Sequence, residues 1–353
     1  MNTLKQFSSG LEAIPMSTAW YIADLSEARG KQELYLKQTP QKLRVLKEHA
    51  LIESAVSSNR IEGVEVDQSR VGSIVLGKKP VFDRNEEEVR GYRNALKWIH
   101  EHYKQIPISE HTVRELHRLT RGEIWDAGDY KKEDCDIVEK YADGRERIRF
   151  KTVSANRTPA SMAGLIKLWE ECLLERWVHP MIAVAAFNLD FLCIHPFRDG
   201  NGRVSRLLLL LQSIRLGYEA GHYISIERCI EDNKQRYYET LELSSQGWHE
   251  GKHDAWPYIN FLLSIFRSVY REFEDRLAKI KSPRGAKTKQ VEAAVEKFSG
   301  RFTLYELEHE CIGVSRDMVR KVLRNLQNSG YVECLGRGPG ALWQKRGNTL
   351  KRG

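Results

Sequence analysis

One short segment combines side chains that phosphate chemistry requires. It runs from His195 to Arg206, reads HPFRDGNGRVSR, and lies between two apolar stretches, 180–194 and 204–216. His195 titrates near neutral pH and can accept a proton from a reacting hydroxyl. Asp199 offers a hard oxygen ligand to Mg²⁺, the ion that usually accompanies nucleotide phosphates. The segment therefore contains a candidate base and a candidate metal ligand four residues apart.

The glycines of the segment indicate an anion site. Gly200 and Gly202, on either side of Asn201, let the backbone turn tightly and approach a ligand closely. The N–H groups of such a turn, at the start of the next helix, attract phosphate oxygens. Arg203 and Arg206 add two full positive charges one helical turn apart. Each feature alone is commonly structural, but their combination within twelve residues favours a nucleotide-phosphate site.

The elements that must position this segment are predicted to be mainly helical. Apolar residues recur at helical spacing along much of the chain, and Asp143-Gly144 between two short runs indicates a β-hairpin over 134–152. The expected helices span 41–60 (ending near Gly63), 86–102, 109–120, 159–175, 180–193, 204–216, 232–244 and 256–280.

The C-terminal part follows another pattern, and Lys281–Gly285 indicates a linker before it. Thr303 and Glu306 form a capping box at the start of one helix, and Ser315 can cap the next. We expect a winged helix-turn-helix with helices over 287–297, from 304 onward and over 316–328, and strands over 331–335 and 341–345.

The net charge of +8 is concentrated in this part of the chain. Residues 281–353 contain 15 basic and 7 acidic residues, so the remainder is neutral. Any nucleic-acid contact is therefore expected there, and docking to a protein is the alternative. The candidate contacts on the third helix and the wing are Arg316, Arg320, Lys321, Arg324 and Arg337.

Composition excludes several other classes of protein. No apolar run is long enough to span a bilayer, and residues 1–10 lack the apolar stretch of a signal peptide, so no membrane contact and a cytoplasmic location are expected. The six cysteines form no CxxC pair, which makes a zinc site or a disulfide framework an unlikely organisation.

His195–Arg206 matches the HxFx(D/E)GNGRxxR motif without a departure, and the chain thereby resembles the Fic family over roughly residues 10–280. The resemblance implies a helical Fic core with a β-hairpin flap. We expect an N-terminal helical region at 1–85, the catalytic core at 86–280 and the winged helix-turn-helix at 281–353.

The resemblance also implies a reaction, the transfer of AMP from ATP to a Ser, Thr or Tyr hydroxyl of a protein. His195 would be the general base, and Phe197 would anchor the loop. Asp199 would hold Mg²⁺ at the α- and β-phosphates. Backbone groups of Gly200, Asn201 and Gly202 would form the anion hole, and Arg203 and Arg206 would hold the β- and γ-phosphates. Doc-type relatives, which are kinases, lack this complete anion hole, so AMP transfer is favoured here.

Two further sites follow from the resemblance. The hairpin at 134–152 would pair with an extended stretch of the target protein. Tyr237 and Tyr238 fall where relatives have adenine-pocket residues, although a paired aromatic on a helix is as often part of the core. Lys131, just before the hairpin, stands where relatives commonly have Arg.

A second motif suggests a built-in brake. Ser58, Glu62 and Gly63 match the (S/T)xxxE(G/N) inhibitory motif of Fic proteins. Glu62 is expected to form a bidentate pair with Arg206 and so to compete with the γ-phosphate. The alternative is a solvated glutamate at the end of a helix.

Other functions remain open at this point. Glu62 could instead position water for the removal of AMP from a modified protein, or the core could be a sensor in a DNA-binding regulator. The target protein is not specified, and the chain itself is one candidate. The oligomeric state is also open, with a homodimer as one option.

Overall fold

The fold is described from a computed structural model. It covers residues 2–10, 13–38, 40–64, 83–122, 124–140, 145–279, 286–298, 300–311, 314–336, 338 and 340–346. The chain divides into two compact units, the first formed by Met1–Glu33 with Leu43–Arg276 and the second by Leu34–Lys42 with Leu277–Gly353. No helix in these ranges is both long and apolar enough to cross a membrane.

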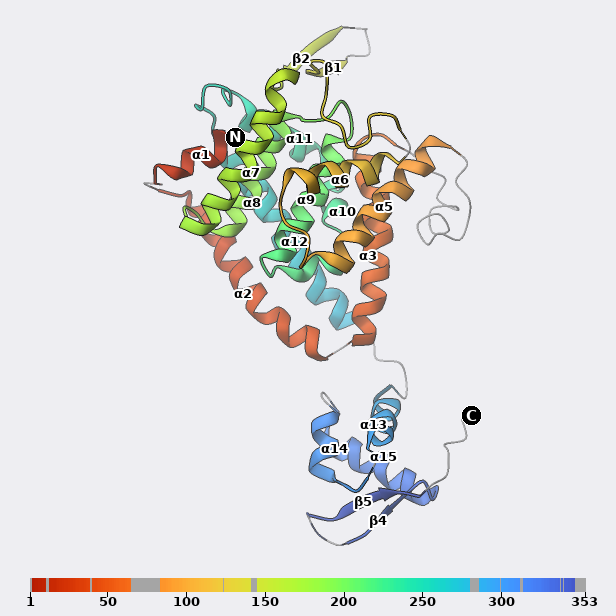
Figure 1. The fold of residues 1–353 in the computed structure, drawn as a ribbon. Helices are drawn as coiled ribbons and strands as arrows, with labels where there is room; N and C mark the ends of the chain where they lie inside the picture. Colours follow the sequence, from red (N-terminus) through yellow and green to blue (C-terminus); the bar gives the residue numbers. More distant parts are fainter. Residues whose placement is uncertain are drawn as a thin grey trace. The chain divides into compact units, whose positions relative to one another are not determined.

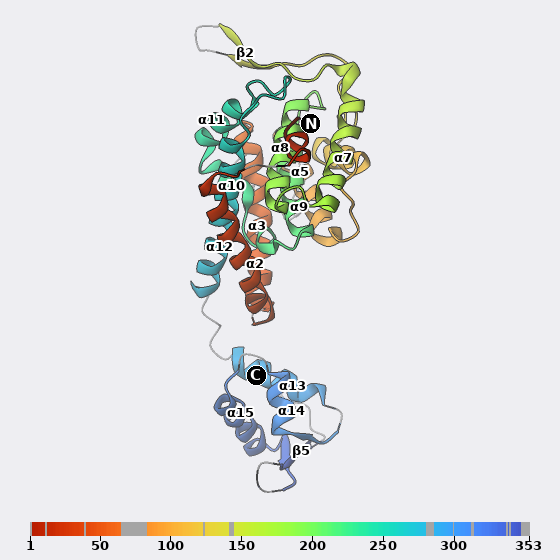
Figure 2. The same ribbon diagram turned by 90° about the vertical axis from the view of Figure 1, so that its left-hand side faces the viewer.

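The first unit is mainly α and is built around two central helices, α8 (Pro180–Ile194) and α9 (Asn201–Arg215). Every residue of α8 from Met181 onward is buried, as expected for a helix that is apolar on all sides. The surrounding helices enclose this pair (Figures 1 and 2). They are α1 (Asn2–Ser8), α2 (Met16–Gln38), α3 (Pro40–Ile61), α5 (Arg84–His102), α6 (Glu110–Arg121), α7 (Thr158–Glu175), α10 (Ile226–Glu231), α11 (Lys234–Ser245) and α12 (Trp256–Lys279), with short 3₁₀ turns at Ala155–Arg157 and Glu219–His222.

The expected helices of this unit are confirmed to within a few residues at each end, with one consequential difference. Helix α9 begins at Asn201 instead of residue 204, so Asn201, Gly202 and Arg203 form its first turn. Helices α1, α2 and α10 were not predicted. The apolar residues of α2 do not gather on one face, and α1 and α10 are too short to show a periodic pattern.

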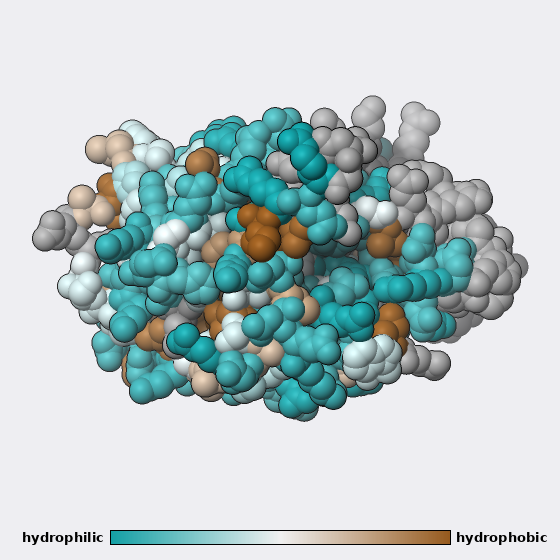
Figure 3. Space-filling view, turned by 90° about the horizontal axis from the view of Figure 1, so that it is seen from above, coloured by the Kyte–Doolittle hydropathy of each residue, from teal (hydrophilic) through white to brown (hydrophobic). Residues whose placement is uncertain are grey.

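The predicted hairpin consists of β1 (Ile137–Lys140) and β2 (Glu146–Phe150), which pair antiparallel with Val138 opposite Ile148. It projects from one end of the unit (Figure 2). The predicted turn at 142–144 lies outside the described residues. The face seen along this end is largely hydrophilic, with small, separated hydrophobic patches (Figure 3).

The second unit contains α13 (Ala286–Lys297), α14 (Leu304–Glu310) and α15 (Arg316–Asn328), which pack with a small antiparallel sheet. The sheet has the order β3 (Phe302–Thr303), β5 (Leu342–Lys345), β4 (Val332–Cys334). Val295, Phe302, Leu307, Val319 and Leu323 are among the residues of its core.

The three helices and the strands β4 and β5 follow one another in the expected order, and β3 is additional. The classification as a winged helix-turn-helix stays a prediction. The capping box of Thr303 and Glu306 is confirmed. Ser315 occupies the N-cap position of α15, as expected, but its side chain makes no capping hydrogen bond. Strand β3 was not predicted, since two residues carry no alternating pattern. The linker at 281–285 and Arg337 lie outside the described residues.

Candidate active site

The segment from His195 to Arg206 forms a tight connection between α8 and α9, here called the motif loop. His195 ends α8 in the left-handed conformation, with φ of 54°, and its N–H donates to the carbonyl of Phe191 at 2.9 Å. The next carbonyl, of Pro196, accepts the N–H of Lys131 at 2.9 Å. The chain before the hairpin thus holds the loop beside the end of α8.

The surroundings of His195 define its protonation state. Its Nδ1 lies 3.3 Å from the carbonyl oxygen of Leu192. A carbonyl can only accept, so the proton of the neutral ring belongs on Nδ1 and Nε2 keeps its lone pair. Burial, assisted by the charge of Lys131, lowers the pKa of His195 to about 4. At neutral pH the ring is therefore neutral, and its Nε2 can accept a proton.

Two residues fix the turn of the motif loop. The side chain of Asn201 accepts the N–H of Phe197 at 2.9 Å and donates to its carbonyl at 2.7 Å. Phe197 is fully buried and stacks on His117 of α6, with ring centroids 3.8 Å apart. Both ends of the Asn201 amide are thus used within the loop, so any contribution of this residue to an anion hole comes from its backbone.

His117 clamps the loop a second time. Its Nδ1 accepts the N–H of Gly128 at 2.9 Å, which places its proton on Nε2, 3.1 Å from the carbonyl oxygen of Asp199. Burial lowers its pKa to about 4, so the neutral ring bridges the two backbone groups.

The first turn of α9 supplies backbone donors. Gly200 precedes the helix with φ of 80°, and no side chain caps the helix N-terminus. The first N–H groups of a helix have no partner within it, and the helix dipole favours an anion there. A Cβ on Gly202 would lie 2.2 Å from Oε1 of Glu62 and 3.1 Å from Nη1 of Arg206. A larger residue at this position would displace the ends of the Glu62 and Arg206 side chains.

Arg206 is 1% exposed, and α3 supplies its partners. Its Nη2 donates to Oε1 of Glu62 at 2.7 Å and to the carbonyl of Ser58 at 2.9 Å. Its Nε donates to the Ser58 hydroxyl at 2.9 Å. The prediction of a bidentate pair is therefore wrong, because Ser58 occupies one edge of the guanidinium and Glu62 accepts a single hydrogen bond. Among the described residues, Nη1 has no partner.

The end of α3 presents Glu62 to Arg206. The helix ends at Ile61, and Gly63 takes the left-handed conformation with φ of 80°, while the N–H of Val64 returns to the carbonyl of Asn59 at 3.0 Å. This is a common way to end a helix with glycine. The predicted stop near Gly63 is confirmed, and the turn leaves the Glu62 side chain 33% exposed.

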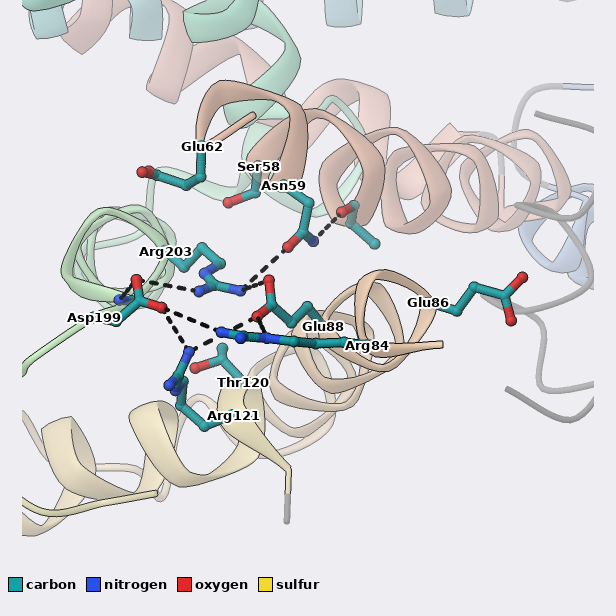
Figure 4. A network of polar contacts seen from close by, with 12 residues as sticks. Ser58, Asn59, Glu62, Arg84, Glu86, Glu88, Thr120, Arg121, Asp199 and Arg203 are labelled. Atoms are coloured by element: carbon teal, nitrogen blue, oxygen red, sulfur yellow. Dashed lines mark hydrogen bonds and ion pairs between the residues drawn. The ribbon is translucent and has the colours of Figure 1, made fainter. Parts of the chain in front are cut away.

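Arg203 is equally buried and has its own carboxylate. Its Nη1 donates to Oε2 of Glu88, on α5, at 2.7 Å, and lies 3.5 Å from Oδ1 of Asn59 (Figure 4). Its Nε has no partner among the described residues. Buried donors on charged groups are rarely left unpaired, so Nε of Arg203 and Nη1 of Arg206 are two donors that an anion could satisfy.

Asp199 lies among cations. Its Oδ2 accepts Nη1 of Arg121 at 2.7 Å, and its Oδ1 accepts the N–H of Gly200 at 2.6 Å. Burial opposes its charge, but Arg203 and Arg121 outweigh burial and lower its pKa.

This carboxylate fits Mg²⁺ in one way only. The described residues include no cluster of three ligand side chains that could hold a metal by itself. Mg²⁺ commonly binds through one or two carboxylates together with substrate phosphates and water. Asp199, with a half-exposed side chain, suits an ion that arrives with a nucleotide.

A pocket of about 280 Å³ adjoins the motif loop. Its lining includes His195, Gly202 and Glu62 together with Tyr237 and Tyr238 of α11. Tyr237 is 2% exposed, and the Tyr238 hydroxyl donates to the carbonyl of Ile61 at 3.3 Å. The predicted base, glycine turn, brake residue and aromatic pair therefore meet at one cavity.

The hairpin forms another wall of this pocket. Ile137 and Arg149 line it, and Arg149 pairs with Glu242 of α11. Lys131 contacts the chain just after β2, where its ammonium donates to the Thr152 hydroxyl at 2.7 Å.

Three buried residues of the site were missed from the sequence: Glu88, His117 and Arg121. His117 and Arg121 are spaced i, i+4 and share one helix face, which is a signal that could have been used. Glu88 ends the run Glu86-Glu87-Glu88, and nothing in that run marks which carboxylate contacts the motif loop.

Comparison with known proteins agrees with the motif. Residues 107–213 match the Fic/DOC family. The chain is 25% identical over 229 residues to the "Protein adenylyltransferase Fic" of Drosophila willistoni and 27% identical over 232 residues to that of Drosophila melanogaster. Each match covers 62% of this chain and 41% of the relative, so it spans about two fifths of the curated relatives' length.

Solved structures share the fold. A Fic family protein from Desulfovibrio desulfuricans G20 aligns over 96% of this chain and 98% of its own, with a TM-score of 0.61 and 23% identity. A Fic domain containing signaling protein from Bacteroides thetaiotaomicron VPI-5482 aligns over 73% of this chain and 99% of its own, with a TM-score of 0.62 and 20% identity. Together with the intact motif loop, these matches define the class of the domain: residues 107–213 form a Fic/DOC domain, and the solved Fic proteins share the fold.

Proposed function

We propose that this chain transfers AMP from ATP to a hydroxyl side chain of a protein and is restrained by Glu62. The observation that carries the proposal is one pocket lined by a neutral histidine, the glycine turn of the motif loop and the glutamate that holds the buried Arg206. His195, Gly202 and Glu62 line this pocket, and Nη1 of Arg206 is unpartnered among the described residues beside Gly202. The curated relatives carry the name protein adenylyltransferase.

In this proposal His195 Nε2 accepts the proton of the target hydroxyl. The hydroxyl oxygen attacks the α-phosphorus, the bond between that phosphorus and the bridging oxygen breaks, and pyrophosphate leaves. The backbone N–H groups at the start of α9 hold phosphate oxygens, and Arg203 and Arg206 hold the β- and γ-phosphates. Asp199 would hold Mg²⁺, which supplies charge neutralisation when bound. Positioning and electrostatic stabilisation therefore account for most of the catalysis.

The hairpin is proposed to hold the target. It projects from one end of the unit (Figure 2), and its residues Ile137 and Arg149 line the pocket. An extended segment of the target could add to an exposed edge of its two strands. Tyr237 and Tyr238 are proposed to receive the adenine, with Tyr238 at the more open position.

Labelled nucleotide tests the proposal. Wild type and Glu62→Gly are incubated with ATP labelled at the α-phosphate and Mg²⁺, in the presence of candidate targets. Labelled protein, more in the variant, is expected. Release of AMP from a pre-modified protein by the wild type, without labelling by either chain, would instead support de-AMPylation.

The second unit supports a second candidate function, the binding of duplex DNA. Arg320, Lys321 and Arg324 are exposed on α15, and in the described part of the unit none of them is in an ion pair. The opposite face of α15 is buried and carries Val319, Val322 and Leu323. Such a helix can contact DNA phosphates and base edges.

The binding of duplex DNA by the full chain should fall steeply as the salt concentration rises. It should also weaken in a double variant, Arg320→Gln with Arg324→Gln, which removes two positive charges from α15. Absence of binding by the full chain even at low salt would rule this function out, and a docking role for α15 would become the better account.

A further inference from the structure

The two arginines of the motif loop are each held by a carboxylate from a different helix. Glu62, at the end of α3, accepts from Arg206, and Glu88 of α5 accepts from Arg203, both at 2.7 Å. The two carboxylates differ in exposure, because the side chain of Glu62 is 33% exposed and that of Glu88 only 5%. A competing anion can displace Glu62 into the pocket, whereas displacing Glu88 would leave buried cations uncompensated.

Glu88 contacts more than Arg203. Its Oε1 accepts Nε of Arg84 at 3.2 Å and lies 3.8 Å from Nη1 of Arg121. Arg121 in turn donates to Oδ2 of Asp199 at 2.7 Å (Figure 4). One buried carboxylate therefore touches Arg203 directly and reaches Asp199 through Arg121.

This arrangement sets the direction of the Arg203 donors. The guanidinium is planar, so a partner on one edge fixes where the remaining N–H groups point. Glu88 takes Nη1, and Nε remains without a partner among the described residues. A second guanidinium, of Arg121, is also buried and bonds both Asp126 and Asp199. Without Glu88 both guanidinium groups would lose an anion and turn toward the acceptors that remain.

We propose that Glu88 is a positioning residue that orients Arg203 toward the β-phosphate of the nucleotide and, through Arg121, holds the carboxylate of Asp199 in place. The naming of the nucleotide rests on the proposed function. Glu62 and Glu88 then have opposite effects on the reaction, since the exposed carboxylate competes with phosphate and the buried one prepares the arginine for it.

The test compares the same substitution at two neighbouring residues. Glu88→Gln removes the charge without changing the shape. Glu87→Gln is the matched control, because Glu87 pairs with Arg90 on the same helix, outside the motif loop contacts. Binding of ADP and of AMP is measured by calorimetry with Mg²⁺ present, alongside the melting temperature. ADP carries the β-phosphate but no γ-phosphate, so competition by Glu62 does not enter.

Glu88→Gln should bind ADP at least about tenfold more weakly than wild type and AMP within about twofold. Glu87→Gln should match the wild type for both. Glu88→Asp, which keeps the buried charge and withdraws it by one methylene, should show a smaller loss of the same selective kind. It keeps the test decisive should the Gln variant not fold.

Wild-type ADP affinity in Glu88→Asp and Glu88→Gln would overturn the proposal. So would an equal loss of ADP and AMP affinity together with a lower melting temperature, because that pattern indicates a purely structural role. Selective loss of ADP binding in a chain that never transfers AMP would leave Glu88 a positioning residue and count against the proposed function. A wild type that binds no ADP would overturn both.

Discussion

Replacing Glu62 with glycine removes the carboxylate and leaves most of the Arg206 site intact. The two bonds to Ser58, both 2.9 Å, remain, so the guanidinium keeps its place and direction. Nη2 loses one of its two acceptors, and Nη1 is already free among the described residues. The γ-phosphate of ATP then becomes the anion that this buried cation lacks, and AMP transfer should increase.

The size of the increase follows from the single bond. A hydrogen bond between charged groups contributes about 1.5–3 kcal/mol, and the lower end applies because Glu62 is one-third exposed and partly screened. Each 1.4 kcal/mol corresponds to about tenfold in rate. We therefore expect roughly a 10- to 30-fold gain, smaller than a bidentate pair would give.

The assay measures incorporation of label from α-labelled ATP over time, at subsaturating nucleotide. Glu62→Gln is the control for backbone freedom, since glycine beside Gly63 also loosens the end of α3, and it should show most of the gain. Arg206→Ala combined with Glu62→Gly should show no gain, because the phosphate partner is missing. A decrease on removing Glu62 would refute the reasoning and point to a role for Glu62 in positioning water.

Three further predictions concern other parts of the first unit. Asp199→Ala should abolish Mg²⁺-stimulated transfer, and stimulation at the wild-type level would show that Asp199 does not hold the metal. In the Glu62→Gly background, where the carboxylate 2.2 Å from the added carbon is absent, Gly202→Ala should lower transfer without unfolding the chain, because that carbon would still lie 3.1 Å from Nη1 of Arg206, where the phosphate is proposed to bind; a melting curve and the transfer assay together check this. Stability should fall as pH drops from about 6.5 toward 4, because burial lowers the pKa of His222 to about 4 and that of His100 well below its usual value, so the unfolded chain binds more protons in this range. Urea unfolding should show a loss of up to about 1.4 kcal/mol per pH unit for each histidine, and the same slope in His222→Asn would contradict this account.

The fold was largely predictable where apolar residues repeat regularly. Helix α8 is apolar over most of its length, α9 contains the apolar run Leu207–Leu211, and the capping box of Thr303 is a local signal. Strand β3 and helix α2 could not be predicted, because the strand is two residues long and the apolar residues of the helix share no face. Their places depend on partners distant in the sequence.

The residues of the site also divide into those that could be predicted from the sequence and those that could not. The motif loop is contiguous, so its base, glycines and arginines could be named from spacing alone. Glu62 was found because a short motif surrounds it, but its bonding was predicted wrongly, since the approach of Ser58 to Arg206 is a tertiary contact. Glu88 and Arg121 lie on α5 and α6, far from the loop in sequence, and only the packed structure shows that their charges meet Arg203 and Asp199.

The most direct test of the central claim is the position of the label that reaches protein. Glu62→Gly is incubated in parallel with ATP labelled at the α-phosphate and at the γ-phosphate, with and without the additional change His195→Ala. The account predicts labelled protein from the α-phosphate alone and none once His195 is replaced, although ATP still binds. Label arriving from the γ-phosphate, or α-label that persists without His195, would contradict it.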